Sequence, residues 1–330
     1  MKFIAIIGLA LSFLLVPGER TMLHWQDTEP PINLSKLPTH PFARPVPAIE
    51  RALIISIDGL RPDVLLRADA PNIRRLYQSG SFTFWARTTA LAVTLPSHVS
   101  MLTGATPEQH GITWNGVLSP NHPIYPAVPT LFEYAHHAGY STAMVIGKTK
   151  FVSLTKPGTL DWVYLPPIAY VTDAVVADEA VKFIRAHQPQ VLFVHFPGVD
   201  VAGHGRGWGT PAQVLAAAEA DRAVGLVLAA LDKMHLRDST FILVTADHGG
   251  QNRGHGPNDP RSQFIPWIAC GPGISSNLDL TRYPKLTVDT EDTFATVCWL
   301  LGIPTAPRRL HGKPITEMIQ RTELLQTVAP

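Results

Sequence analysis

Residues 241–256 read FILVTADHGGQNRGHG. The apolar run Phe241–Val244 predicts a buried strand, and the Gly-rich loop after it holds Asp247, His248 and His255. Glycine lets a backbone turn tightly enough to direct these side chains toward one point. Imidazole nitrogen and carboxylate oxygen are ligands of Zn²⁺ and similar ions. The stretch therefore predicts a strand end that carries part of a divalent-metal site.

Two further predicted strands end in the same way. Residues 52–57 form an apolar strand before Asp58, and residues 191–196 form another before Asp200 and His204. An Asp-Gly pair after a strand is often an ordinary turn, and Asp200 with His204 also fits a capping or ion-pair arrangement. Three such endings in one chain nevertheless favour a shared site, because ligands gather beyond the carboxyl ends of parallel strands.

The rest of the chain alternates between predicted strands and predicted helices. Further strands are predicted at 82–87, 141–146 and 264–269, and helices at 70–80, 95–104, 129–137, 173–187, 211–234 and 292–301. Apolar strands that alternate with helices are typical of a mostly parallel sheet covered on both faces. The sequence therefore predicts an α/β fold, with residues 51–330 as a single domain.

Composition excludes several classes of protein. Of the 330 residues, 45% are hydrophobic and 16% charged, which fits a packed core and argues against disorder. The net charge of +1 provides no basic surface for a nucleic-acid duplex or an anionic membrane. Cys270 and Cys298 both follow or interrupt apolar runs, so we expect small core residues, with a disulfide as the alternative.

The N-terminal segment predicts export. Lys2 precedes the apolar run Phe3–Val16, which has the length of the hydrophobic region of a signal peptide. Residues 1–18 are therefore predicted to be a signal peptide or an uncleaved anchor that could tether the chain to a membrane. A buried strand or helix is the alternative. Residues 19–50 are Pro-rich and predict a linker or a wrapping arm. The expected location is periplasmic or extracellular.

A candidate nucleophile lies where a loop meets a helix. Thr94 precedes the short helix predicted at 95–104, and the amides and dipole of a helix N-terminus favour an anion. A threonine hydroxyl is a poor nucleophile at neutral pH, but metal coordination would lower its pKa. Taken alone, Thr94 would be an ordinary capping residue.

Together these motifs resemble the alkaline phosphatase superfamily, and most of all its type I phosphodiesterase/nucleotide pyrophosphatase branch. The resemblance runs from about residue 51 to about residue 314. It rests on SIDG (56–59), TLPSH (94–98), LTG (102–104), PEQHGI (107–112), DVAGH (200–204), DHG (247–249), HG (255–256) and LHGKPI (310–315). It implies an α/β/α sandwich and a catalytic domain at 51–330 that uses two divalent ions, usually Zn²⁺.

The resemblance also assigns residues to roles. One ion would be held by Asp58, Thr94, Asp247 and His248, and the other by Asp200, His204 and His255. It implies a double displacement, in which Thr94 attacks phosphorus and the resulting phosphothreonine is hydrolysed. Asn115 matches the position that donates a hydrogen bond to a non-bridging phosphoryl oxygen. Without the resemblance, Asn115-Gly116 would be interpreted as a type I′ turn.

The choice of phosphate ester depends on charge near the site. Leu95, Trp114 and Tyr125 could form the apolar wall of a phosphodiesterase. Lys148 and Lys150 follow the strand at 141–146 and are similar to the basic pair of phosphonoacetate hydrolases, which would suit a monoester or a phosphonate. The alternative for both lysines is a solvated strand end.

We expect a phosphodiesterase or nucleotide pyrophosphatase that acts on a small-molecule phosphate ester. A phosphomonoesterase or phosphonoacetate-hydrolase-like enzyme is the alternative. A sulfatase is less expected, because threonine does not become the formylglycine of those enzymes. A non-catalytic binding relative is disfavoured by the intact ligand set. The sequence does not predict the oligomeric state.

Overall fold

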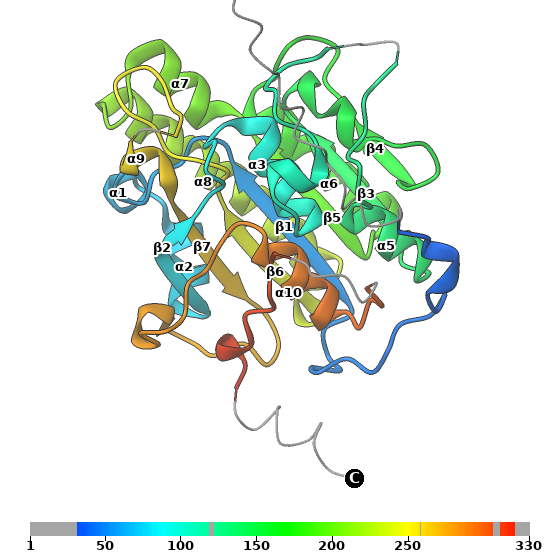
Figure 1. Ribbon diagram of the computed structural model, residues 1–330. Coiled ribbons are helices and arrows are strands. Elements are labelled where there is room, and N and C mark those ends of the chain that lie inside the picture. The colour runs from blue at the N-terminus through cyan, green and yellow to red at the C-terminus, as the bar shows by residue number, and fades with distance from the viewer. Residues whose placement is uncertain (1–31, 119–121, 258, 306–310, 321–330) are drawn as a thin grey trace, which may run out of the picture. The chain divides into compact units, whose positions relative to one another are not determined.

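The centre of the sheet consists of four buried parallel strands. They are β1 (Arg51–Ile57), β3 (Thr142–Ile146), β5 (Val191–Phe196) and β6 (Thr240–Thr245). They lie in the order β3-β5-β1-β6, as Figure 1 shows. Because helices cover both faces, these strands are apolar along almost their whole length rather than alternating. All four strands were predicted from the sequence.

A computed structural model describes residues 32–118, 122–257, 259–305 and 311–320 of the chain. The described residues belong to one compact unit, which begins at Ile32. The predicted signal peptide or anchor at 1–18 and the first part of the predicted linker lie outside the described residues. Within the described part of the chain, no helix is both long and apolar enough to cross a membrane.

The complete sheet has eight strands in the order β4-β3-β5-β1-β6-β7-β2-β8. The outer strands are β4 (Trp162–Tyr164), β7 (Phe264–Cys270), β2 (Ser81–Arg87) and β8 (Leu278–Asp279). β7 runs antiparallel to both of its neighbours, β6 and β2, whereas the other pairings are parallel. The prediction of a mostly parallel sheet is confirmed.

Helices form a layer on each side of the sheet (Figure 1). In one layer the long helix α8 packs against its neighbours α1, α2, α6 and α7, and in the other α3 packs against α4, α5 and α10. The helices are α1 (Pro62–Arg67), α2 (Pro71–Gln78), α3 (Thr94–Thr103), α4 (Pro107–His110), α5 (Leu131–His137), α6 (Asp173–His187), α7 (Gly198–Arg206), α8 (Pro211–Lys233), α9 (Pro260–Gln263) and α10 (Asp292–Leu300). Short 3-10 turns are η1 (Leu34–Lys36), η2 (Thr149–Leu154), η3 (Arg237–Ser239), η4 (Leu280–Arg282) and η5 (Thr316–Met318). The α/β/α sandwich is confirmed.

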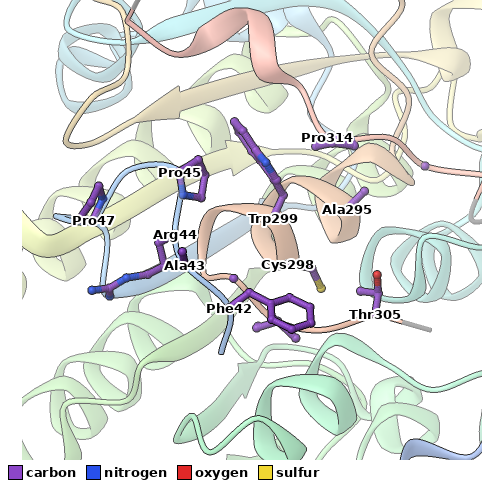
Figure 2. Close-up of a pocket in the computed structure, with 13 residues that line it drawn as sticks. Phe42, Ala43, Arg44, Pro45, Pro47, Ala295, Cys298, Trp299, Thr305 and Pro314 are labelled. Carbon is purple, nitrogen blue, oxygen red and sulfur yellow. The ribbon is translucent and has the colours of Figure 1, made fainter. Parts of the chain in front are cut away.

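The segment before β1 packs on the rest of the unit. Val46 and Ile49 are buried, and an open cavity of about 800 Å³ lies between residues 42–47 and α10 (Figure 2). No carboxylate or imidazole is among the described residues that line this cavity, so the Asp and His side chains predicted as metal ligands lie elsewhere. Cys298 lines it, and both Cys298 and the half-buried Cys270 are free thiols.

Candidate metal centre and nucleophile

Three neighbouring strands bring the predicted ligand residues to one edge of the sheet. Asp58 follows β1, Asp247 and His248 follow β6, and Asp200 lies in the first turn of α7, just after β5. β1 lies between β5 and β6 in the sheet, so the carboxyl ends of the three strands meet. Strand order therefore explains why residues far apart in the sequence converge.

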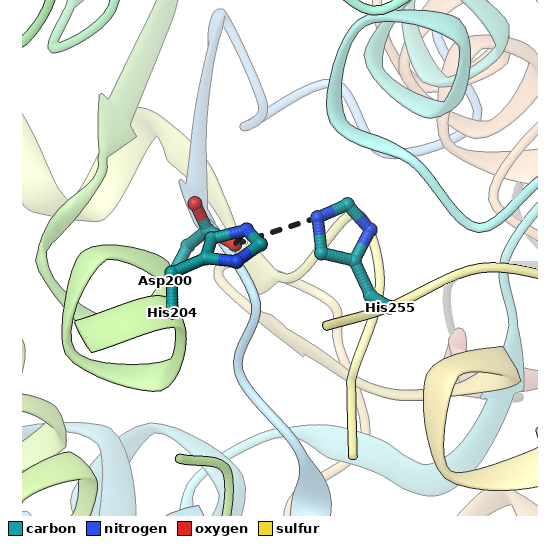
Figure 3. A group of neighbouring side chains, drawn as sticks. All are labelled: Asp200, His204 and His255. Atoms are coloured by element: carbon teal, nitrogen blue, oxygen red, sulfur yellow. Dashed lines mark ion pairs between the residues drawn. The ribbon is translucent and has the colours of Figure 1, made fainter. Parts of the chain in front are cut away.

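Asp200 and His204 belong to helix α7, which the sequence did not predict. They are four residues apart, so both side chains lie on one face of the helix, and His204 Nε2 is 3.3 Å from Asp200 Oδ1. His255 approaches the same oxygen from the loop after β6, with its Nε2 at 3.8 Å (Figure 3). The three side chains are close enough to share one ion.

A second group of side chains surrounds Thr94. His248 Nε2 lies 3.3 Å from Thr94 Oγ1, 3.4 Å from Asp58 Oδ1 and 3.2 Å from Asp247 Oδ2. Asp200 is also close enough to Asp58 and His248 to share an ion with them. These five residues are 3% exposed or less. The two predicted ligand sets are therefore adjacent, with Asp200 next to both.

The three imidazoles are oriented by backbone carbonyls. Each donates its Nδ1–H to one carbonyl: His204 to Arg253 at 2.9 Å, His248 to Gly249 at 2.8 Å and His255 to Ala92 at 2.9 Å. Such a bond fixes the tautomer and leaves Nε2 as the electron-pair donor. Ala92 has a φ of +46°, a strained conformation of the kind that clusters at functional sites.

Three carboxylate oxygens in the centre accept no hydrogen bond from the described residues. They are Asp58 Oδ1, Asp200 Oδ1 and Asp247 Oδ2, and all three are buried. An unpaired buried carboxylate oxygen is costly unless a cation compensates it. These oxygens face the same imidazole Nε2 atoms described above. The residues present therefore fit divalent ions with oxygen and nitrogen ligands.

The pKa values of the carboxylates and imidazoles also suit a site for divalent ions. Burial raises the pKa of Asp58 and Asp200, but Lys148 and the neighbouring imidazoles together outweigh it, so the pKa of Asp58 lies well below its usual range and that of Asp200 at about 2. Burial and the nearby Asp58 raise the pKa of Asp247. Burial and His255 lower the pKa of His248 to about 4. A neutral imidazole between carboxylates is the protonation state that binds a metal.

Thr94 begins helix α3 but does not cap it. The N-cap residue is Val93, and no side chain makes a capping hydrogen bond there. The Thr94 hydroxyl instead faces His248, at the helix end where amides and the dipole favour an anion. Thr94 is therefore not an ordinary capping residue, which was the alternative interpretation of the sequence.

Asn115 lies beside the N-terminus of α3. Its Oδ1 accepts hydrogen bonds from the Leu95 backbone N–H and from Lys150 Nζ, both at 3.0 Å. Two donors on one atom identify it as the oxygen and leave the Nδ2 group to donate elsewhere. The structure thus places a side-chain amide next to the residue that follows Thr94.

The two lysines after β3 have different surroundings. Lys150 is half-buried and contacts Asn115. Lys148 is only 7% exposed, and its Nζ lies 2.7 Å from Asp58 Oδ2 and 2.5 Å from Asp200 Oδ2. Neither lysine is the solvated strand end that was the alternative.

Several buried residues that support the site were not predicted. His195, on β5, donates from Nε2 to Asp58 Oδ2 at 2.9 Å. His98 bonds Ser56 Oγ at 2.7 Å and the Thr94 carbonyl at 2.8 Å. The sequence does contain one indication for His195, because it is an imidazole inside an otherwise apolar strand. A buried polar group of this kind needs a hydrogen-bond partner.

Trp208 also supports the centre. Its ring centroid lies 5.0 Å from that of His204 and 5.8 Å from that of His255, and its Nε1 donates to the Gly59 carbonyl at 3.0 Å. A Cβ at Gly203 would lie 2.7 Å from this ring, so only glycine fits there. Trp208 therefore fixes the position of two candidate ligands.

Known proteins are similar to this chain in sequence and in fold. The type I phosphodiesterase/nucleotide pyrophosphatase family matches residues 52–255, more than half of the chain. The bis(5'-adenosyl)-triphosphatase enpp4 of Xenopus laevis is 25% identical over 219 residues, which cover 60% of this chain and 47% of the frog protein. The chain thus spans about half the length of that relative.

Two solved structures show the same fold. An inactive variant of murine ectonucleotide pyrophosphatase/phosphodiesterase 5, in complex with AMP, superposes with a TM-score of 0.69 at 14% identity and covers 82% of this chain and 100% of that chain. A 2-O GAG sulfatase superposes with a TM-score of 0.64 at 18% identity, over 82% of this chain and 74% of that chain. The alkaline-phosphatase-like fold is confirmed.

Proposed function

Because the chain belongs to the type I phosphodiesterase/nucleotide pyrophosphatase family, we propose that it is a two-metal phosphodiesterase or nucleotide pyrophosphatase with Thr94 as its nucleophile. The observation that carries this proposal is the position of Thr94 Oγ1, 3.3 Å from His248 Nε2 and beside unpaired carboxylate oxygens. A hydroxyl in these surroundings has no evident structural purpose, since it does not cap its helix.

Two ions, with zinc the best match to these ligands, would be held by the two sets of side chains. Asp58, Thr94, Asp247 and His248 form the set at the nucleophile, and Asp200, His204 and His255 form the other. When bound, such ions lower the pKa of a coordinated hydroxyl or water and offset the charge on the phosphoryl oxygens.

Side chains of the protein position the phosphoryl group and react with it. Thr94 Oγ1 forms a bond to phosphorus as the bond to the leaving-group oxygen breaks, which gives a phosphothreonine that still carries the second ester group of a diester substrate. Asn115 Nδ2 donates to a non-bridging oxygen, because its Oδ1 is already held by Leu95 N–H and Lys150. Water then cleaves the phosphothreonine and regenerates Thr94. The N-terminus of α3 favours the negative charge throughout.

The substrate follows from relatives and from charge. The frog relative is named as a triphosphatase of a bis-adenosyl compound, so we propose small nucleotides or other diesters as substrates here. The alternative is a monoesterase or phosphonoacetate-hydrolase-like enzyme that uses Lys148 and Lys150. What favours it is the Lys150 ammonium beside Asn115, where it could meet an additional anionic group.

We also propose export, since the solved relative is named an ectonucleotide enzyme. Residues 1–18 would direct it as a signal peptide or anchor, residues 19–50 would be the linker or arm, and residues 51–330 the catalytic domain. Fractionation of cells that express the full chain, followed by N-terminal sequencing, tests this. A protein that stays in the cytoplasm with Met1 intact would contradict it.

Turnover of model substrates tests the function. Purified protein is treated with a chelator, supplied with Zn²⁺ and assayed with bis-p-nitrophenyl phosphate, p-nitrophenyl phosphate and phosphonoacetate. We expect diester turnover that needs Zn²⁺ and is lost in Thr94→Ala. A strong preference for the monoester or phosphonoacetate would favour the alternative, and metal-independent turnover would contradict both.

A further inference from the structure

Lys148 lies inside the metal centre rather than at its rim. It follows β3, which neighbours β5 in the sheet, and β5 in turn neighbours β1. The ammonium group therefore reaches the carboxyl ends of β5 and β1, where Asp200 lies in the first turn of α7 and Asp58 directly follows its strand. The side chain is 9% exposed, so its charge is balanced by these two partners rather than by water.

Each of the two carboxylates divides its oxygens between different partners. The Oδ2 atoms of Asp58 and Asp200 accept from Lys148 Nζ, at 2.7 Å and 2.5 Å. The Oδ1 atom of Asp58 lies 3.4 Å from His248 Nε2, and the Oδ1 atom of Asp200 lies 3.3 Å from His204 Nε2. Neither Oδ1 accepts a hydrogen bond from the described residues.

We propose that Lys148 is a positioning residue that bridges the two metal-ligand sets. By holding one oxygen of Asp58 and one of Asp200, it turns the other oxygen of each toward its own set and limits both residues to one ligand atom. The inference rests on the proposed function, because the two sets are the ones assigned there. It differs from a substrate contact, since both observed partners of Nζ are carboxylates of the centre.

The positive charge of Lys148 should also affect the stability of the fold. Asp58, Asp200 and Asp247 place three carboxylates in a space that is buried from solvent, and unpaired charges there are destabilising. The single positive charge of Lys148 is shared between Asp58 and Asp200 and offsets one of these negative charges within the protein itself. We therefore expect the folded protein without bound ions to be more stable than it would be if Lys148 did not contact the carboxylates.

Lys150 provides a matched comparison. It is two residues away and carries the same charge, but its ammonium bonds the Asn115 carboxamide rather than a carboxylate. Lys148→Met and Lys150→Met therefore remove equal charge from the same segment, and only the first removes the bridge.

Thermal unfolding with and without zinc tests the charge role. In chelator-treated protein we expect Lys148→Met to unfold about 5–10 °C below the wild type, and zinc to close most of that gap. Lys150→Met should change the unfolding temperature little under either condition. In proteins that bind zinc, an equal loss with and without it would overturn the charge role, and no loss in the chelator-treated protein would overturn it in every case. If Lys148→Met does not fold, Lys148→Gln is measured in the same way.

The visible spectrum of cobalt-loaded protein tests the positioning role. Freed Oδ2 atoms would add ligands, and a higher coordination number weakens the absorption of Co²⁺, so we expect a weaker band in Lys148→Met. Lys148→Arg, which keeps the bridging charge, should retain the wild-type band. Identical spectra in all three proteins would overturn the proposal. If no protein binds Zn²⁺ or Co²⁺, the two-metal function fails instead, while the chelator-treated comparison still decides the charge role.

Discussion

Lys150 Nζ lies 3.0 Å from Asn115 Oδ1, and the Leu95 N–H donates to the same oxygen at the same distance. The carboxamide is thus held from two sides, with its Nδ2 group left free to act as a donor. A donor that is fixed before the reaction does not have to be reorganised as charge develops.

Substitution of Asn115 or Lys150 should therefore lower kcat more than it raises KM. We expect Asn115→Ala to reduce kcat by about 10²- to 10³-fold, because it removes a transition-state donor. Lys150→Met should reduce it about 10-fold, because it only loosens that donor. Steady-state kinetics with bis-p-nitrophenyl phosphate measure both, and Lys150→Arg is the rescue control. A larger loss for monoesters than for diesters in Lys150→Met would instead support a substrate contact.

The two histidines of the loop after β6 should affect different steps. We expect His255→Ala to accumulate phosphothreonine at Thr94, because His255 belongs to the set that serves hydrolysis of the intermediate. His248→Ala should slow the formation of the intermediate, because His248 faces the Thr94 hydroxyl. Intact-mass spectrometry after an acid quench reports the adduct, which with a diester substrate is one phosphoryl group that still carries its second ester group. The assignment is wrong if His248→Ala accumulates the adduct and His255→Ala does not.

Trp208 should be needed for one of the two metal sets. Removal of the ring in Trp208→Ala leaves space beside His204 and His255, whose rings it contacts. We expect the zinc content to fall from two equivalents toward one, measured by elemental analysis after gel filtration. Trp85→Ala is the control, since that side chain is 63% exposed on β2. Unchanged zinc content in Trp208→Ala would show that the ring does not position these ligands.

Asp173 should make stability depend on pH. Burial raises its pKa to about 7, although the Gly198 N–H donates to it at 2.8 Å. The folded state therefore keeps a proton that the unfolded state loses near pH 4, so stability falls as pH rises from 4 to 7 and stays low above 7.

Replacement by asparagine should remove that dependence. We expect Asp173→Asn to be more stable than the wild type at pH 8, by roughly 4 kcal/mol at most, and no more stable at pH 4. Urea unfolding at the two pH values measures this. Asp178→Asn, on the exposed face of the same helix, should show no such difference. Equal effects of the two substitutions would contradict the assignment to Asp173.

The sequence predicted the strands better than their directions. β1, β5 and β6 were evident because strands buried on both faces are continuously apolar. The same apolar run in β7 does not reveal that this strand is antiparallel, since direction depends on its neighbours. Helix α7 was not predicted, because Gly198, Gly203 and Gly205 all lower helix propensity. Packing against α8 stabilises it in the folded protein.

The candidate site, too, could be predicted only in part from the sequence. The ligand residues were predictable because their residue types follow recognisable strands. The position of Lys148 was not, because it depends on β3 lying next to β5. Nor was the support given by His195, whose partner Asp58 is 137 positions away. Local patterns identify which side chains can do chemistry, and strand order decides which of them touch.

The distance between these partners along the chain has a consequence for refolding. The Gly59 N–H donates to Asp247 Oδ1, which is 188 positions away, and β1 lies between β5 and β6. Pairings that close such long loops are slow to form, and neither half of the chain contains the complete set of ligands. The return of activity after dilution from denaturant would therefore report completion of the central sheet, and should lag behind the recovery of helical signal.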